Sequence, residues 1–272
     1  MTKLDDNRLT KTFAALRSAG KKALLPFITA GFPDLDATVA LLKEFESRGV
    51  RICELGIPFS DPVADGPVIQ ASYTQVLADG ITVDKIFQAA SRYRSEGGKL
   101  ALIAMVSYSI VFRHGVEAFL ADAARAGFDG VIIPDLPLEE AGTVEPLAAK
   151  VGLCNIMLIA PTSPADRQLE IARHSRGFIY FVSVAGITGE RTKLPESTIA
   201  AVTELRTHTD TPVCVGFGVS SAAIVAAVCK AADGAIVGSA IVSRIAEAAK
   251  LPREKMVRQV GDFVAKLLAP IR

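Results

Sequence analysis

The chain has 272 residues, half of them hydrophobic, which is enough for one large core. Its 30 Lys and Arg nearly balance its 29 Asp and Glu, so nothing predicts binding to nucleic acid or to an anionic membrane surface. The N-terminal residues are acidic and lack an apolar core, so we expect no signal peptide. The longest apolar run, near residues 100–112, is too short and too polar to span a bilayer.

Short apolar runs alternate with amphipathic segments along the chain. The runs are almost continuously apolar and rich in Val and Ile, which is typical of strands buried on both faces of a parallel sheet. The predicted strands cover residues 23–30, 51–56, 100–106, 130–135, 154–160, 178–183, 212–217 and 234–238. The predicted helices cover residues 7–18, 36–49, 67–79, 84–95, 116–126, 139–150, 165–174, 196–206, 220–230, 241–249 and 253–268.

Eight strand–helix units in roughly 250 residues predict an α/β fold, the (β/α)₈ TIM barrel, whose functional residues lie at the C-terminal ends of the strands. The alternative is a doubly wound open sheet, but no G-x-G-x-x-G follows the first strand. No linker or break in composition divides the chain, so we expect one domain over residues 1–272. The extra N-terminal helix at 7–18 is expected to close the bottom of the barrel.

Cysteine and histidine do not predict a metal site. The four cysteines form no C-x-x-C pair and three lie in predicted strands, so we expect reduced, buried thiols in a cytoplasmic protein. The three histidines are far apart in sequence. His174 and His208 lie near helix ends that lead into strands, away from the predicted active face, so we expect no bound metal.

Three glycine-bearing segments, at 185–189, 216–220 and 238–241, follow the last three predicted strands. Glycine lets the backbone approach a ligand closely, and free N–H groups at a helix start hold an anion. Each glycine alone could merely permit a turn, but barrels often bind phosphate in this quarter. The expected phosphate contacts are Gly189, Gly218, Gly238 and Ser239. No Walker-type lysine occurs, which favours a monophosphate ester.

The second predicted strand ends on an acid, Glu54, and a Gly/Pro-rich loop follows with Asp61 and Asp65. Burying an unpaired charge costs several kcal/mol or raises its pKa, so acids clustered at a strand end predict acid–base chemistry. The structural alternatives are a salt bridge from Glu54 to Arg51 and turn-stabilising roles for the aspartates, including Asp135 after the fourth strand. No lysine ends a predicted strand, so a Schiff-base aldolase is not expected.

The segment at 54–70, E-L-G-I-P-F-S-D-P-V-A-D-G-P-V-I-Q, resembles the signature of the tryptophan synthase alpha subunit family. Similar segments lie at 26–34, 134–140, 186–189, 216–220 and 237–242, in the family's order and over almost the whole chain. A signature of this length is a specific signal, unlike a lone glycine motif.

The resemblance implies retro-aldol cleavage of indole-3-glycerol phosphate to indole and D-glyceraldehyde 3-phosphate in tryptophan biosynthesis. In family terms Glu54 is the general acid–base, and Asp65 holds the indole N–H and stabilises the positive charge that develops there. The loop at about 185–194 is expected to close over the substrate, with Thr188 touching Asp65. The expected residues of the indole pocket and its loop are Phe27, Ile69, Ile132, Tyr180, Thr188, Phe217 and Ile236.

The resemblance also implies a partner, a beta subunit that carries pyridoxal phosphate in an alpha-beta-beta-alpha tetramer, and no cofactor in this chain. One segment departs from the family. Where many members carry a Tyr-Tyr-Asn-Pro type segment after the third strand, this chain reads S-Y-S-I at 107–110, and Tyr108 is the candidate to supply the missing ring. The mouth loops, including Asp61 and this segment, are the expected docking surface.

Three other functions stay open at this point. The first is another phosphate-binding barrel enzyme, such as indole-3-glycerol phosphate synthase or a histidine-pathway isomerase. A synthase of that kind should show a catalytic lysine at a strand end. A stand-alone indole-releasing lyase would use the same chemistry without a partner. A catalytically inactive binding barrel would keep the fold alone.

Overall fold

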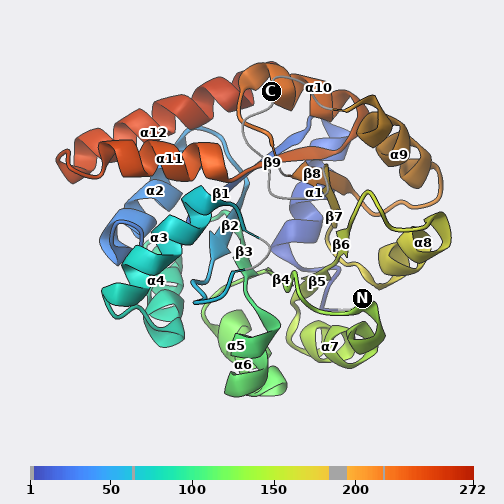
Figure 1. Ribbon diagram of the computed structural model, residues 1–272, viewed down its shortest axis with the longest axis horizontal. Coiled ribbons are helices and arrows are strands. Elements are labelled where there is room, and N and C mark those ends of the chain that lie inside the picture. The colour runs from blue at the N-terminus through green and yellow to red at the C-terminus, as the bar shows by residue number, and fades with distance from the viewer. Residues whose placement is uncertain (1–2, 63–64, 184–194, 217) are drawn as a thin grey trace.

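The computed structural model of the chain describes residues 3–62, 65–183, 195–216 and 218–272. Parallel strands form a barrel and helices surround it (Figure 1), so the predicted (β/α)₈ fold is confirmed. Along the barrel wall the strand order is β5-β4-β3-β2-β1-β9-β8-β7-β6. The strands are β1 (Ala23–Thr29), β2 (Ile52–Gly56), β3 (Ala101–Met105), β4 (Gly130–Ile132), β5 (Cys154–Ile156), β6 (Leu158–Ile159), β7 (Ile179–Val182), β8 (Val213–Gly216) and β9 (Gly234–Val237).

The strand predicted at 154–160 is divided in the structure. β5 pairs with β4 and β6 pairs with β7, so the two pieces together fill one place in the barrel wall. The break falls at Met157, whose N–H donates to the hydroxyl of Ser175 at 3.0 Å rather than to a neighbouring strand. Because Ser175 is 18 residues further along the chain, a tertiary contact causes the break and the apolar run could not predict it.

Every predicted helix is present, with ends that shift by a residue or two. No helix of the described ranges is long and apolar enough to cross a membrane. The helices are α1 (Arg8–Ser18), α2 (Leu35–Ser47), α3 (Pro67–Ala78), α4 (Val83–Ser95), α5 (Tyr108–His114), α6 (Val116–Arg125), α7 (Leu138–Val151), α8 (Ala165–His174), α9 (Glu196–Thr207), α10 (Ala222–Ala231), α11 (Ser239–Ala248) and α12 (Arg253–Leu268), and a 3₁₀ turn follows at Ala269–Ile271.

The short helix α5 was not predicted. It begins in the S-Y-S-I segment, and Ser107 is its N-cap. The carboxylate of Asp135, from the loop after β4, accepts hydrogen bonds from the Ser107 hydroxyl and the Tyr108 N–H, both at 2.7 Å. A seven-residue helix is marginal on its own, so this acid from a distant loop supports its first turn.

Polar side chains cap the start of several helices, where backbone N–H groups lack helical partners. At each of these caps a side-chain oxygen accepts a hydrogen bond from a backbone N–H of the first turn. The capping residues are Asn7, Asp34, Thr82, Ser107 and Ser221.

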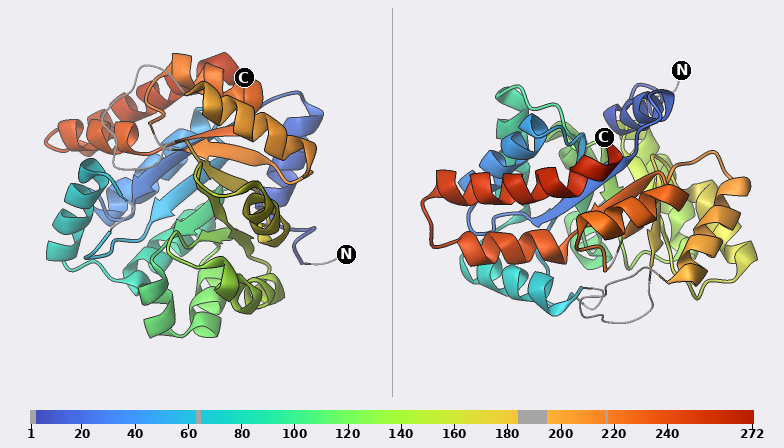
Figure 2. Two further views of the ribbon diagram at one scale, coloured as in Figure 1. Left: turned by 45° about the vertical axis from the view of Figure 1, so that its right-hand side comes forward. Right: turned by 90° about the horizontal axis from the view of Figure 1, so that it is seen from above.

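Helix α1 lies at the N-terminal end of the barrel, as predicted (Figure 2). Leu9 and Phe13 are buried there, and the Phe13 ring lies 5.7 Å from the ring of Phe178, just before β7. The amide of Asn7 donates to the carbonyl of Gly152, which precedes β5, at 2.7 Å. These contacts hold the helix against the end of the barrel opposite to the one that carries function in this fold.

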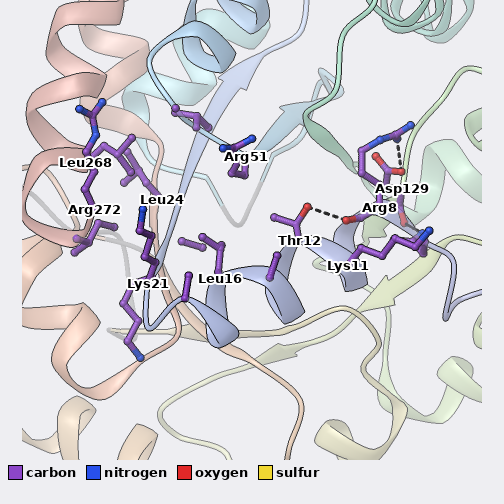
Figure 3. Close-up of a pocket in the computed structure, with 18 of the residues that line it drawn as sticks. Arg8, Lys11, Thr12, Leu16, Lys21, Leu24, Arg51, Asp129, Leu268 and Arg272 are labelled. Carbon is purple, nitrogen blue, oxygen red and sulfur yellow. Dashed lines mark hydrogen bonds and ion pairs between the residues drawn. The ribbon is translucent and has the colours of Figure 1, made fainter.

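A cavity of about 1500 Å³ lies beside α1 at this end. Figure 3 shows the side chains of α1 on one side of it and Arg51, which precedes β2, on another. The charged residues that line it are mostly basic: Lys3, Arg8, Lys11, Lys21, Lys22, Arg51 and Arg272, with Asp6 and Asp129.

Asp129 joins α1 to the barrel through a buried ionic contact. Its carboxylate accepts hydrogen bonds from Arg8 at 2.6 Å, from Arg94 at 2.9 Å and from the N–H of Leu102 at 2.9 Å. Arg94 is mostly buried and also donates to the carbonyl of Gly127. Removing the carboxylate would therefore leave a guanidinium without its counter-charge in the protein interior.

We predict that Asp129→Ala lowers the free energy of unfolding by about 3 kcal/mol, because breaking a buried ion pair leaves the partner charge uncompensated. Denaturant titration measures this loss. The control is Lys11→Ala, which removes an exposed pair with Asp6 and should change little. Equal losses in the two variants would contradict the structural role given to Asp129.

Candidate active site

Glu54 lies inside the barrel wall on β2. Its register partners are Phe27 on β1 and Ile103 on β3, and the residue is 1% exposed. Neither carboxylate oxygen has a hydrogen-bond partner among the described residues. Burial raises the pKa of Glu54 to about 8, so near neutral pH the group holds a proton that it can donate.

The alternative of a salt bridge between Glu54 and Arg51 is not found in the structure. Arg51 precedes β2 and lines the cavity beside α1. Glu54 lies three residues further along, within β2, and its oxygens are unpaired in the described part of the chain. Its burial therefore has no ionic compensation from this arginine.

Asp65 lies in the loop between β2 and α3. The side-chain amide of Gln70 donates to the carbonyls of Asp65 at 2.8 Å and Pro62 at 3.3 Å, and the Asp65 N–H donates to the Pro62 carbonyl at 3.1 Å. Gln70, rather than the Asp65 carboxylate, thus fixes the described part of the turn. Partial burial raises the pKa of Asp65 to about 6, so the group is ionised at pH above that value.

A small cavity of about 50 Å³ opens at this mouth of the barrel. It brings together acids of two segments that are distant in sequence, the loop after β2 and the loop after β4. The lining residues are Ile57, Phe59, Asp61, Pro62, Asp65, Tyr73, Met105, Val106, Ser107, Pro134 and Asp135. Of the acids predicted to cluster at the end of the second strand, Asp61 and Asp65 line this cavity together with Asp135, whereas Glu54 is not among the described residues that line it.

Tyr180, on β7, belongs to the same neighbourhood. It is buried, and the negative charges of Glu54 and Asp65 add to burial in raising the pKa of its hydroxyl well above the usual value. Its hydroxyl occupies the space where a Cβ on Gly216 would lie. Because Gly216 has no side chain, the end of β8 leaves room for the phenol of Tyr180 beside the two acids.

The apolar residues predicted around the indole fall into two groups. Phe27 and Ile69 meet at the end of β9, where a Cβ on Gly238 would lie 3.5 Å from the first and 3.6 Å from the second. Ile132 and Ile236 are fully buried strand residues of β4 and β9, and Ile236 pairs with Leu25, which lies deeper in the barrel than Phe27. Phe217 and Thr188 lie outside the described residues.

The predicted phosphate contacts lie at the ends of two adjacent strands, β8 and β9. Gly218 has φ +72°, and among the described residues other than its chain neighbours no heavy atom lies within 4 Å of the position that a Cβ would take. Gly238 is the N-cap of α11 and forms no side-chain cap, and the exposed Ser239 begins that helix. The first N–H groups of α11 are therefore available to an anion. Gly189 lies outside the described residues.

The S-Y-S-I segment places Tyr108 outside the mouth cavity. Its ring packs 6.1 Å from that of Phe112, which is 71% exposed. The aromatic residues that line the cavity are instead Phe59, from the loop after β2, and Tyr73, from α3. Sequence analysis missed Tyr73 and Gln70, although Tyr73 is four residues after Ile69 and so lies on the same face of the helix.

Each of the three histidines forms a hydrogen bond with an acidic side chain. His114 contacts Asp122 at 2.9 Å, and His174 contacts Glu145 at 2.8 Å. His208 contacts Glu204 on α9. Within the ranges that the structure describes, no group of three or more His, Cys, Asp or Glu side chains is arranged to hold a metal ion.

Comparison with known proteins identifies similar chains. The sequence matches the family model of the tryptophan synthase alpha chain over residues 13–268. A tryptophan synthase alpha chain of Chloroflexus aggregans is 46% identical over 239 residues, or 88% of this chain and 90% of that protein. The crystal structure of tryptophan synthase subunit alpha from Legionella pneumophila aligns with a TM-score of 0.88 at 35% identity, covering 97% of this chain and 98% of that one. A chain of Mycobacterium tuberculosis tryptophan synthase aligns with a TM-score of 0.88 at 33% identity, covering 98% of both chains.

The buried carboxyl of Glu54 predicts a stability that depends on pH. Between the usual carboxyl pKa near 4.5 and the folded value of about 8, the unfolded chain has lost the proton and the folded chain keeps it. Stability therefore falls as pH rises through this window and is level above it. We expect Glu54→Gln to stabilise the fold relative to the parent by an amount that grows across the window to roughly 5 kcal/mol.

Denaturant titrations of both chains at about pH 5, 7 and 9 measure this difference. Glu170→Gln on α8 is the control, because Glu170 is exposed and its substitution should give a difference that does not vary with pH. A constant difference for Glu54→Gln as well would mean that Glu54 ionises normally in the folded chain.

Proposed function

Since the chain belongs to the tryptophan synthase alpha chain family, we propose that the acids at the mouth of its barrel perform the family's reaction. The chain is a carbon–carbon lyase of tryptophan biosynthesis, and it cleaves indole-3-glycerol phosphate to indole and D-glyceraldehyde 3-phosphate. The observation that supports the assignment of residues is the buried, unpaired Glu54 with a second acid, Asp65, close enough for both charges to act on Tyr180.

In the proposed mechanism Glu54 works first as an acid. Its raised pKa leaves a proton on the carboxyl at neutral pH, and this proton passes to C3 of the indole ring. The ring then carries a positive charge on its nitrogen. As the carbon–carbon bond breaks, its electron pair returns to the ring. The Glu54 carboxylate then takes the proton of the substrate hydroxyl on the glycerol carbon that was bonded to C3. That hydroxyl becomes the aldehyde of glyceraldehyde 3-phosphate, and Glu54 ends the cycle protonated.

Asp65 has the complementary role of a fixed anion. With a pKa of about 6 it is mostly ionised at neutral pH, so it can accept a hydrogen bond from the indole N–H. As the ring becomes cationic, the contact becomes one between opposite charges. It therefore stabilises the transition state more than the ground state. Different burial thus gives two carboxyl groups opposite protonation states at one pH.

Phosphate binding is proposed at the ends of β8 and β9. Gly218, Gly238 and Ser239 offer backbone N–H groups, and the dipole of α11 favours an anion at its start. Phe27 and Ile69 lie beside Gly238, which would set the apolar indole between the phosphate and the acids. Four further expectations stay predictions: the phosphate contact of Gly189, the roles of Thr188 and Phe217 at the indole pocket, and the closure of the loop at about 185–194.

We further propose a beta subunit as partner, in an alpha-beta-beta-alpha tetramer, with pyridoxal phosphate on the partner and no cofactor in this chain. The likeness to a chain of tryptophan synthase from Mycobacterium tuberculosis supports a complex. The mouth offers a docking surface in exposed Phe112 and Asp61. We propose the cytoplasm as the location, which suits a biosynthetic enzyme with four free cysteines.

We predict that Glu54→Gln and Asp65→Asn each lower the rate of indole release by a factor of about 10² or more. Both variants should still bind a non-cleavable indole alkyl phosphate, because phosphate and indole contacts provide the binding. The parent should have its highest kcat/KM between the two pKa values, about 6 and about 8. Glu170→Gln is the matched control. Parent-like turnover in Glu54→Gln would overturn the assignment.

The partner is tested with the purified chain, by measuring indole release with and without a tryptophan synthase beta subunit. We expect slow release by the chain alone and acceleration by the partner, because docking at the mouth would complete the site. Fast release that the beta subunit leaves unchanged would indicate a stand-alone lyase. No release in either mixture would indicate a binding barrel.

A further inference from the structure

Tyr73 is a buried phenol with no assigned role at the mouth of the barrel. It lies on α3, is 3% exposed and lines the same small cavity as Asp65. No hydrogen bond joins its hydroxyl to the described residues, and this oxygen is not one of their fully buried unpartnered atoms, so it is open to the cavity that the residue lines. A donor of this kind that points into a site is available to a ligand, to water or to a neighbouring acid.

Glycine at position 56 admits this hydroxyl to the barrel. A Cβ on Gly56 would lie 2.7 Å from the Tyr73 hydroxyl and would also collide with the ring of Phe27. Gly56 is two residues after Glu54 on β2, so it shares the inner face of that strand. The phenol of Tyr73 therefore extends from α3 to the C-terminal end of β2, two residues beyond Glu54.

The segment that carries Tyr73 is held rigidly. The hydroxyl of Thr29 on β1 lies 2.6 Å from that of Ser72, which donates to the Ile69 carbonyl at 2.7 Å. Gln70 donates to the Asp65 carbonyl. The loop at Asp65 is thus bonded to the first turn of α3, the same helix that carries Tyr73, and both residues line the cavity.

The charge of Asp65 acts on Tyr73. Together with burial, it raises the pKa of the phenol well above the ordinary value, so the hydroxyl keeps its proton throughout the working range. A neutral hydroxyl beside an anion orients its hydrogen toward the negative charge. A cavity of about 50 Å³ with several polar groups on its wall has room for a bridging water.

We propose that Tyr73 is a positioning residue for Asp65, and that its hydroxyl donates a hydrogen bond that reaches the Asp65 carboxylate through one water in the mouth cavity. This inference rests on the role proposed for Asp65 above. The bond stabilises the ionised carboxylate and holds it toward the indole nitrogen. Without it, Asp65 keeps its proton to a higher pH and loses activity on the acid side.

The test is Tyr73→Phe in the full chain, with kcat/KM for indole release measured from about pH 5 to about pH 9. On the acid side of the curve of kcat/KM against pH, which we call the acid limb, activity depends on ionisation of Asp65 with its pKa of about 6. We expect this limb to move up by about one pH unit. Activity should then fall several-fold near the old midpoint and change little near pH 8. The control is Tyr108→Phe, which removes the same atom at the same mouth but outside the cavity, and should leave the limb in place.

An unmoved limb in Tyr73→Phe would overturn the proposal, and so would a uniform loss of activity at all pH values with a lower melting temperature. The second of these results would mean that the phenol only supports the fold. NMR titration of the carbon-13-labelled Asp65 carboxyl in the free chain gives a readout that needs no substrate. It should show the same upward shift.

Asp65→Asn in the same series separates the two ideas. If Asp65→Asn retains full activity, the role proposed for Asp65 is wrong, and the role proposed for Tyr73 is then wrong as well. If Asp65→Asn is inactive while Tyr73→Phe keeps the parent's limb and the parent's Asp65 titration, only the inference about Tyr73 is wrong. The double variant should lose no more activity than Asp65→Asn alone, because Tyr73 acts through Asp65.

Discussion

An unpaired carboxyl group inside a packed barrel is the constraint on which the rest of this site depends. Glu54 has no counter-charge and no hydrogen bond from the described residues, and hydrophobic strands lie on both sides of it. Such a group is tolerated because it can keep its proton. The free energy that this costs comes from the large apolar core around the barrel. The fold therefore maintains at neutral pH an acid that would be ionised in water.

The other elements of the site follow from this arrangement. Asp65 sits on a loop rather than in a strand, so it is closer to solvent and ionises at a lower pH than Glu54. Glycines at the ends of two strands, Gly56 on β2 and Gly216 on β8, admit the phenols of Tyr73 and Tyr180 near the acids. Strand ends thus supply the proton donor, while loops and helices supply the anion and the groups that hold it.

Much of this could be predicted from the sequence, because burial of whole strands leaves a simple apolar pattern. The barrel, the helices and the approach of Asp65 and Asp135 at one end follow from that pattern and from the polarity of the fold. The break at Met157, the helix α5 and the position of Tyr73 could not be predicted in the same way. Each depends on a partner far along the chain or on space left by a missing side chain, as at Gly56.

The cavities at the two ends of the barrel differ in the charge of the described side chains that line them. Basic side chains such as Arg51 and Lys21 line the cavity beside α1, whereas Asp61, Asp65 and Asp135 line the mouth. The three acids do not attract a phosphate ester from solution, and the Debye length of about 8 Å at physiological salt confines their effect to their near surroundings. Substrate capture then relies on short-range contacts at the start of α11. The same acids would orient a partner with a basic face toward the mouth before contact.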